Sequence, residues 1–145
     1  MGKFMQSKLE SVAEYLPEIV LEMVDLVGFV DVEKIINQFG GTTFRFTDGS
    51  VYFPRLKELI GLESAGKLRH YFNAEEVYIP RCETALRLLR NERLVADFDF
   101  ITQGEKKSGR TAMLELCPKY QLSDRQAWEI VRTHQVQQYR QDSLF

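Results

Sequence analysis

The sequence contains few of the residues that build metal centres and disulfide frameworks, with two cysteines and two histidines among its 145 residues. Cys82 and Cys117 are 35 positions apart, and neither these cysteines nor His70 and His134 have the spacing of a zinc site. We therefore expect no metal and no other cofactor, and we interpret the cysteines as free thiols. The sequence also contains no Gly-rich phosphate loop, HExxH pattern or nucleophile elbow, so it does not predict an enzyme.

Long apolar runs are absent as well. Runs such as residues 19–21 are far shorter than the roughly 20 residues that cross a bilayer. The N-terminal residues lack the apolar stretch of a signal peptide. From these two observations we expect a cytoplasmic protein that does not enter a membrane.

The sequence has no large excess of charge of one sign, because its net charge is −2. The charges are nevertheless unevenly distributed. Residues 1–50 carry 4 basic and 8 acidic side chains, whereas residues 105–145 carry 7 basic and 5 acidic ones. This gradient places any contact with phosphate groups toward the C-terminal end.

Apolar residues recur at helical spacing along most of the chain, which predicts a mainly α fold with short β-strands. The expected helices cover residues 17–28, 31–39, 56–60, 63–72 and 82–96, and Pro17 is placed in a first turn. A period of two predicts strands at residues 42–46 and 50–53, which flank Asp48-Gly49 as a β-hairpin. A further strand is expected at residues 75–79, where Pro80 ends it.

Residues 27–44 resemble residues 60–77 without gaps, at a constant offset of 33 positions. The matched pairs are Lys34 with Lys67, Ile35 with Leu68, Phe39 with Phe72, and Phe44 with Val77. This internal similarity predicts two copies of a helix-and-strand unit, each too small to be stable alone. The alternative is a chance similarity between two amphipathic patterns.

Residues 110–134 predict two helices joined by a short turn. Ser123 has the chemistry of an N-cap, and Gln126 three residues later completes a capping-box pattern. The second helix has an inward stripe of Ala127, Ile130, Val131 and His134 and an opposite stripe of Arg125, Trp128, Glu129 and Arg132. Arginine pairs with guanine and glutamine with adenine, so this pattern predicts the recognition helix of a helix-turn-helix. The alternative is an ordinary amphipathic helix whose charged face is solvated.

The segment Tyr78-Ile79-Pro80-Arg81, followed by a charged helix, resembles the signature of the Mor family, the middle-operon transcription activators of Mu-like phages. The turn at residues 119–123 and the tail at residues 139–145 are similar to the same family. The resemblance implies a helical dimerisation domain at residues 1–98, a linker at residues 99–109 and a helix-turn-helix domain at residues 110–145. It implies a transcription activator of phage or prophage type that binds DNA sequence-specifically. Such a protein binds an inverted repeat in double-stranded DNA as a homodimer and recruits host RNA polymerase.

The expected DNA contacts come from both parts of the chain. Arg125, Gln126 and Arg132 are expected at bases or nearby phosphates, with Trp128 on the same face. Backbone contacts are expected from Lys106, Lys107, Arg110, Lys119 and Ser123. The resemblance implies minor-groove contact by the strand before the Ile-Pro-Arg segment, and its positions here are Glu76 and Tyr78, with Arg81 beside them.

Two features depart from the family pattern. Glu76 would place a carboxylate against the minor groove, where the DNA phosphates repel it. The additional 33-residue unit is compatible with a pseudo-dimeric N-terminal half inside one chain, and the sequence leaves open whether the two units pair within or between chains.

Two other functions remain open at the level of sequence. The acidic first half, together with Asp124 and Glu129, is compatible with a protein-interaction module, such as an antagonist or heterodimer partner of a related activator. Such a module would bind DNA weakly or not at all. An enzyme would need a convergent set of acid, base or metal-binding residues, which the sequence does not display.

Overall fold

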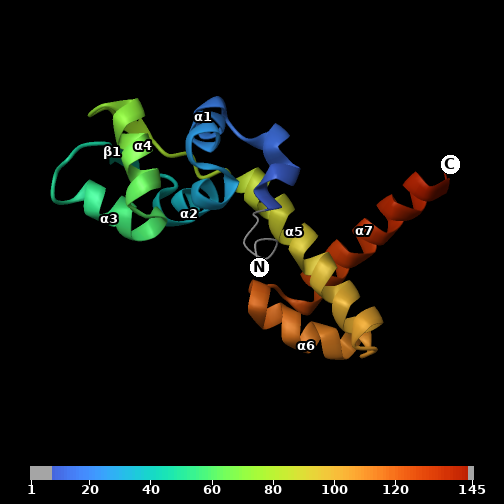
Figure 1. Cartoon of the computed structure of the whole chain (residues 1–145). Coiled ribbons are helices and arrows are strands. Elements are labelled where there is room, and N and C mark those ends of the chain that lie inside the picture. The colour runs from blue at the N-terminus through green and yellow to red at the C-terminus, as the bar shows by residue number, and fades with distance from the viewer. Residues whose placement is uncertain (1–7, 144–145) are drawn as a thin grey trace. The chain divides into compact units, whose positions relative to one another are not determined.

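The computed structural model describes residues 8–143, and within this range the protein is mainly α-helical, as predicted (Figure 1). The chain divides into two compact units, residues 1–86 and residues 87–145. No helix among the described residues has the length and apolar character needed to cross a membrane.

The first unit contains the 3₁₀ helix η2 (Lys8–Tyr15), four α-helices and two short strands. The helices are α1 (Glu18–Val27), α2 (Phe29–Phe39), α3 (Tyr52–Ile60) and α4 (Leu62–Phe72), and the strands are β1 (Thr43–Arg45) and β2 (Glu76–Tyr78). Pro17 is the N-cap of α1, so the regular helix begins where the sequence predicted it.

A glycine lies between the two helices of each pair, α1–α2 and α3–α4. Gly28 ends α1 with φ +87°, and its N–H donates to the carbonyl of Val24. Gly61 ends α3 with φ +91° and donates in the same way to the carbonyl of Lys57. Residues with a side chain rarely adopt such a φ, so glycine is required at both corners.

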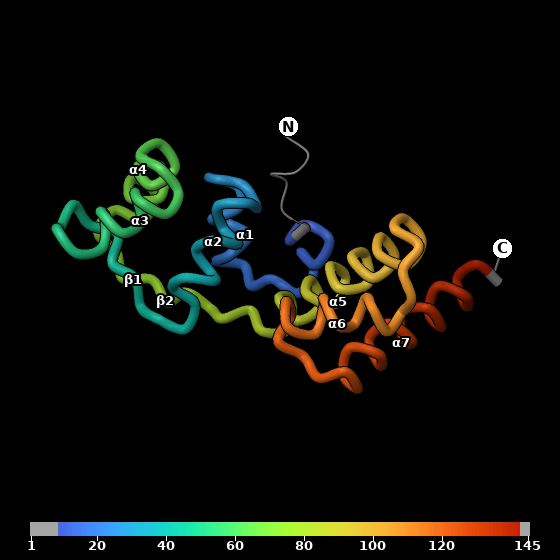
Figure 2. Tube along the Cα trace, turned by 90° about the horizontal axis from the view of Figure 1, so that it is seen from below, coloured from blue at the N-terminus to red at the C-terminus, as the bar shows by residue number. Residues whose placement is uncertain are grey.

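The two strands form one antiparallel sheet, in which Phe44 lies opposite Val77 (Figure 2). Both side chains are buried, whereas the neighbouring residues on each strand are exposed. Helix α2 and strand β1 are matched at an offset of 33 residues by α4 and β2. The offset found in the sequence therefore relates pairs of elements that have the same secondary structure.

The predicted hairpin at residues 42–53 is wrong, because the partner of β1 is β2 and Tyr52–Ile60 is helix α3. Asp48-Gly49 lies in a loop, where the Asp48 carboxylate pairs with Arg69 of α4. Pro54 is compatible with the first turn of a helix, where its missing N–H has no intrahelical partner to lose. Alternation of apolar residues was too short a signal here to distinguish a strand from the start of a helix.

The second unit is built from α5, which spans Glu83–Asp99 and extends beyond the boundary, the π-helical turn η3 (Phe100–Gly104), α6 (Gly109–Tyr120) and α7 (Asp124–Ser143). One apolar cluster joins these elements. Its buried members are Leu94, Phe98, Ile101, Ala112, Met113, Leu116, Ala127 and Val131. Burying each of the larger side chains, from valine to phenylalanine, contributes about 1.5–3 kcal/mol, which holds the three helices together.

The observed boundary between compact units differs from the predicted domain limits. The expected division into a dimerisation domain, a linker and a DNA-binding domain, at residues 98 and 109, stays a prediction. In the structure Phe98 and Ile101 belong to the core of the second unit. The expected linker at residues 99–109 includes the turn η3 and the first residue of α6.

Candidate nucleic-acid interface

Helix α7 begins with the capping box that the sequence predicted. The Gln126 N–H donates to Ser123 Oγ at 3.2 Å, and the Ser123 N–H donates to Gln126 Oε1 at 3.0 Å. These two hydrogen bonds satisfy backbone amides at the helix start and fix the residue at which α7 begins. The Gln126 amide oxygen is thereby directed at the backbone of Ser123, at the start of the helix.

One face of α7 is held in the core by Ala127 and Val131, which are buried. Trp128 was predicted on the outward stripe, and this placement is wrong, since its half-buried indole packs edge-on against Phe98 with ring centroids 5.6 Å apart. The same indole approaches Gly109 so closely that a Cβ there would lie 2.7 Å from Trp128 Cη2. Trp128 therefore joins α5, α6 and α7.

His134 was predicted on the inward stripe and is exposed instead. The buried stripe ends at Val131, and residues 132–142 of α7 are all exposed. The reason is length, because a helix of 20 residues is about 30 Å long and extends beyond the helices against which its first turns pack.

The outward face of α7 carries arginines at helical spacing. Arg125, Glu129 and Arg132 are all exposed, and they lie on the side opposite Ala127 and Val131. The Arg132 guanidinium lies 6.0 Å from the centroid of the Trp128 ring, a distance at which the ring face attracts a cation. This contact orients the Arg132 side chain along the helix surface.

The outward face continues along α7 beyond the residues predicted from the sequence. Val136 and Tyr139 are exposed, Tyr139 by 75%, and with Arg132 and Arg140 they line a shallow surface hollow. Tyr139 follows Arg132 by seven residues, which is the spacing between Arg125 and Arg132. A stripe with this period could have been read from the sequence by extending the pattern beyond residue 134.

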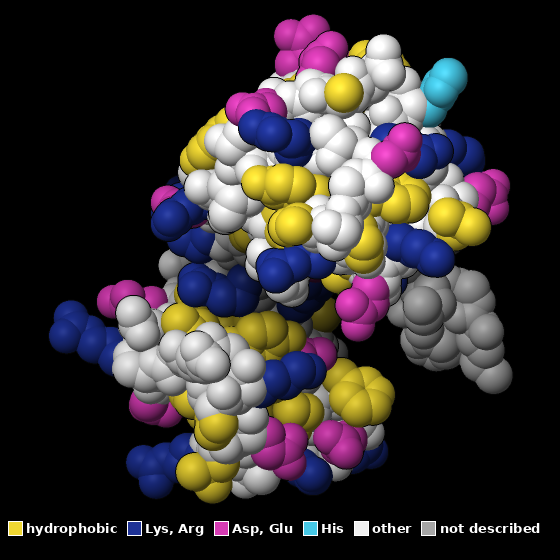
Figure 3. All heavy atoms as spheres, turned by 90° about the vertical axis from the view of Figure 1, so that its left-hand side faces the viewer, with side chains coloured by type: hydrophobic (Ala, Val, Ile, Leu, Met, Phe, Trp, Pro, Cys, Tyr) yellow, Lys and Arg dark blue, Asp and Glu magenta, His cyan; other side chains and the backbone are white. Residues whose placement is uncertain are grey.

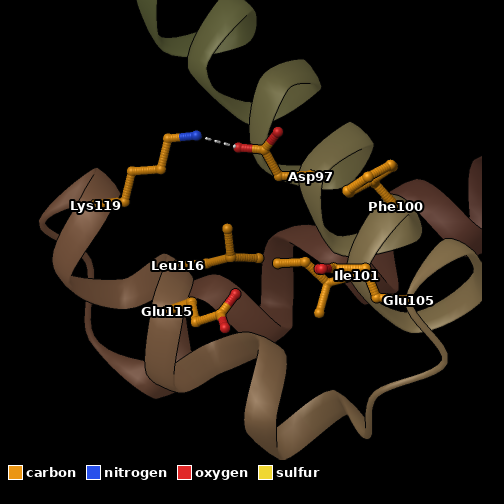
Figure 4. A pocket seen from close by; sticks show the side chains of 7 residues that line it. All are labelled: Asp97, Phe100, Ile101, Glu105, Glu115, Leu116 and Lys119. Atoms are coloured by element: carbon orange, nitrogen blue, oxygen red, sulfur yellow. Dashed lines mark hydrogen bonds and ion pairs between the residues drawn. The ribbon is translucent and has the colours of Figure 1, made fainter.

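Two of the three lysines expected at the DNA backbone have carboxylate partners in the second unit. Lys107 Nζ lies 3.3 Å from Glu115 Oε1 and 3.8 Å from Glu105 Oε2. Lys119 Nζ lies 2.7 Å from Asp97 Oδ2, at the edge of a surface hollow of about 330 Å³ (Figure 4). Phosphate would have to compete with these carboxylates, whereas Lys106 and Arg110 are exposed at the start of α6.

Asp97 also fixes the C-terminal end of α6. The Tyr120 hydroxyl donates to Asp97 Oδ2 at 2.5 Å, so one carboxylate oxygen accepts from both Tyr120 and Lys119. Burial and the neighbouring Asp97 carboxylate raise the pKa of Tyr120 above its ordinary value. The turn that leads into α7 begins at the next residue. These two bonds therefore hold the residues just before that turn against α5.

The remaining predicted residues lie in the first unit, on and after β2. Glu76 pairs with Arg45 directly across the sheet, which compensates the carboxylate that departed from the family pattern. Tyr78 is 56% exposed on the same face, opposite Thr43. Arg45 was not predicted, because its position beside Glu76 follows only from the strand register.

Arg81 lies against the backbone at Gly41, where a Cβ would come within 2.5 Å of its Nε. Its guanidinium is also 3.8 Å from the Glu83 carboxylate. Charges of both signs are interspersed on the face drawn in Figure 3. The first unit therefore offers local cationic positions within a surface of mixed charge.

The cysteines lack the environment of reactive thiols. Burial raises the pKa of the Cys82 thiol, and burial together with the Asp124 carboxylate raises that of Cys117. Both thiols are therefore protonated at neutral pH, which disfavours nucleophilic chemistry. Among residues 8–143 no group of three or more His, Cys, Asp and Glu side chains is placed to hold a metal ion.

A three-helix unit whose last two helices are joined by three residues, and whose last helix presents arginines outward, is typical of small transcription regulators. The model of the Mor transcription activator family matches residues 48–144, which are 97 of the 145 residues. The chain belongs to the Mor transcription activator family. No curated protein and no solved structure matches the chain.

The segment matched by the family model corresponds to particular elements of the fold. It begins in the loop before α3 and contains α3, α4, β2 and residues 87–144 of the second unit. Helices α1 and α2 and strand β1 precede it. The family match thus includes one helix-and-strand copy, and the other copy lies outside it.

Proposed function

We propose that the protein is a sequence-specific DNA-binding transcription activator in which α6 and α7 form a helix-turn-helix and α7 is the recognition helix. The observation that carries the proposal is the outward face of α7, where Arg125 and Arg132 are exposed opposite the buried Ala127 and Val131. An arginine fork donates two parallel hydrogen bonds to guanine in the major groove. The capping box at Ser123 supports this role, because a helix that begins at a fixed residue presents its first turns in a defined position.

Contacts with the DNA backbone follow from the same unit. Lys106 and Arg110 are exposed near the start of α6, where cations suit phosphate contacts that add affinity without reading sequence. Lys107 and Lys119 contribute less in this proposal, because they already pair with carboxylates. Trp128 supports the interface from behind by positioning Arg132.

The finer predictions from the sequence belong to this proposal. A single chain carries one α6–α7 pair, so recognition of both halves of an inverted repeat takes two chains. A homodimer at a phage-type promoter, contact with host RNA polymerase and a cytoplasmic location remain predictions, as do minor-groove contacts of Glu76, Tyr78 and Arg81.

A selection experiment tests the proposal. Fragments bound by the full chain are selected from a random double-stranded DNA pool at about 0.15 M salt, where weak phosphate-driven binding is suppressed. The wild type is compared with the Arg125→Ala/Arg132→Ala variant. The matched control, Lys34→Ala/Arg55→Ala, removes the same charge from exposed positions of the first unit. We expect one enriched motif for the wild type and the control, and its loss in the α7 variant.

The second candidate, a protein-interaction module, is favoured by one observation. Asp124 and Glu129 lie exposed beside the arginines of α7, and both would face phosphates in a DNA complex. Absence of enrichment by folded wild-type protein would reject the DNA-binding proposal in favour of this module. Equal loss of enrichment in the control would show that net charge, rather than the α7 face, determines binding.

A further inference from the structure

The two helix-and-strand copies contact each other through equivalent positions. We define the first copy as residues 18–45 and the second copy as residues 51–78, which are related by the offset of 33. Phe44 of β1 lies opposite Val77 of β2, and these two positions are exactly equivalent under that offset. Thr43 lies opposite Tyr78 and Arg45 opposite Glu76, so the strand register is symmetric about the central pair.

The helices repeat the same relation. Ser64 Oγ of α4 donates to Asp31 Oδ2 of α2 at 2.8 Å, and these residues are again 33 positions apart. Helix α1 of the first copy packs against α4 of the second, and α3 of the second packs against α2 of the first. Reciprocal contacts, with the residues nearest the axis facing their own equivalents, are the signature of a two-fold interface.

The two copies differ in how the chain continues. After β2 the chain enters α5 and the second unit, whereas after β1 it enters α3. The paired copies are therefore followed by one α6–α7 pair per chain. Each strand is only three residues long and carries a charged residue, Arg45 or Glu76, which makes the outer edges of the sheet poor templates for another chain.

We propose that the first copy is an internal partner: it occupies, within the chain, the surface on which a second chain would otherwise dimerise. The protein is then a monomer with one DNA-binding arm, which reads a single half-site. The half-site statement rests on the proposed function, whereas the internal pairing does not. The homodimer predicted from the sequence is the opposite outcome, and the mass measurement below distinguishes the two.

Disulfide trapping tests the internal pairing without DNA. Arg45→Cys/Glu76→Cys is introduced into the full chain with Cys82→Ala and Cys117→Ala, and it places two thiols at exposed positions directly opposite each other. Opposed residues of antiparallel strands lie about 4.5–5.5 Å apart, within the range that a disulfide spans. The Arg45→Cys variant in the same background is the control for random oxidation between chains.

The expected result is a disulfide within one chain, so that the oxidised double variant migrates as a single chain on a non-reducing gel. Light scattering of the wild type is expected to give one chain mass, 16.9 kDa, at every concentration tested. A disulfide that joins two chains would overturn the internal pairing. A wild-type mass of two chains would overturn the one-armed monomer.

A DNA titration then separates this inference from the proposed function. If selection yields a motif, we expect duplexes with one half-site and with two half-sites to bind with the same affinity per half-site, within about twofold. Cooperative binding that is more than tenfold tighter on the double site would overturn the one-armed reading. If selection yields no motif, the proposed function fails while the trapping and mass results still decide the internal pairing.

Discussion

Replacement of Gly109 by alanine places a methyl group against the only tryptophan of the chain, Trp128. The new Cβ would lie 2.7 Å from Cη2 and 3.3 Å from Cζ2 of the indole, and 3.6 Å from Cζ of Phe98. Carbon atoms rest at about 3.5–4.0 Å, so the indole must move by about 1 Å. Phe98 packs edge-on against the same ring and opposes that movement.

The expected cost combines two opposing effects. Overpacking a core typically costs about 1–3 kcal/mol, whereas alanine in place of glycine gains up to about 1 kcal/mol in a helix. We therefore expect Gly109→Ala to lower the free energy of unfolding by about 1–2 kcal/mol. Gly66→Ala is the matched control, because a Cβ at this position inside α4 meets no atom within 4 Å. It should raise the free energy of unfolding by about 0.5–1 kcal/mol.

Urea denaturation measures both variants, with Trp128 fluorescence reporting on the second unit and far-UV circular dichroism on the whole chain. Gly109→Ala should also shift the emission of Trp128, since the indole has to leave its packed position. An unchanged midpoint with unchanged emission would refute the argument that this contact holds α6 and α7 in place. A loss of stability in Gly66→Ala would refute the propensity estimate instead.

Three further predictions concern single side chains of the second unit. The pKa of Tyr120 is higher in the folded chain than in the unfolded chain, where it is near 10.0. The protonated hydroxyl therefore contributes its full stabilisation below pH 10.0, and this contribution falls as the pH rises above that value. Tyr120→Phe should therefore lose the hydrogen bond to Asp97 and have a lower free energy of unfolding than the wild type. This difference should shrink between pH 9 and pH 11, roughly the window set by the pKa of tyrosine. A difference that stays constant across this window would contradict the prediction. Ser123→Ala should cost about 1 kcal/mol in urea denaturation, with Ser123→Asp retaining the cap, and equal stability of all three proteins would argue against the capping box. Arg132→Ala should weaken specific DNA binding by about 1–3 kcal/mol, and Arg132→Lys should not restore base discrimination, which competition with mismatched duplexes measures; unchanged specificity would show that Arg132 reads no base.

Local signals were sufficient for most of the helices and for the start of α7. Pro17, Gly28 and Gly61 act on their own backbone, so a helix boundary follows from the residue itself. The Ser123–Gln126 capping box is equally local, since its two partners are three residues apart. The expected limits of these elements agree with the structure to within a few residues.

Features that depend on distant partners could not be predicted in the same way. The apolar alternation near Phe44 predicted a strand correctly, but its partner 33 residues away supplies the pairing, and the nearer segment forms α3. Trp128 falls on the outward stripe of an ideal helix, yet its indole is wide enough to reach Phe98 and Gly109. The pairing of Lys119 with Asp97 likewise needs the packing of α5 against α6.

The contact between Asp31 and Ser64 has a consequence for how this protein can change. In an assembly of two identical chains, a residue on the symmetry axis faces its own twin, so an aspartate there would meet an aspartate and be repelled. Here a serine faces an aspartate at 2.8 Å, and two identical chains cannot place two different residues opposite each other at an axial position. Because one gene encodes both halves, complementary substitutions can arise on the two sides of the axis. Each mutation then changes one half of the pair, whereas in a homodimer it would change both.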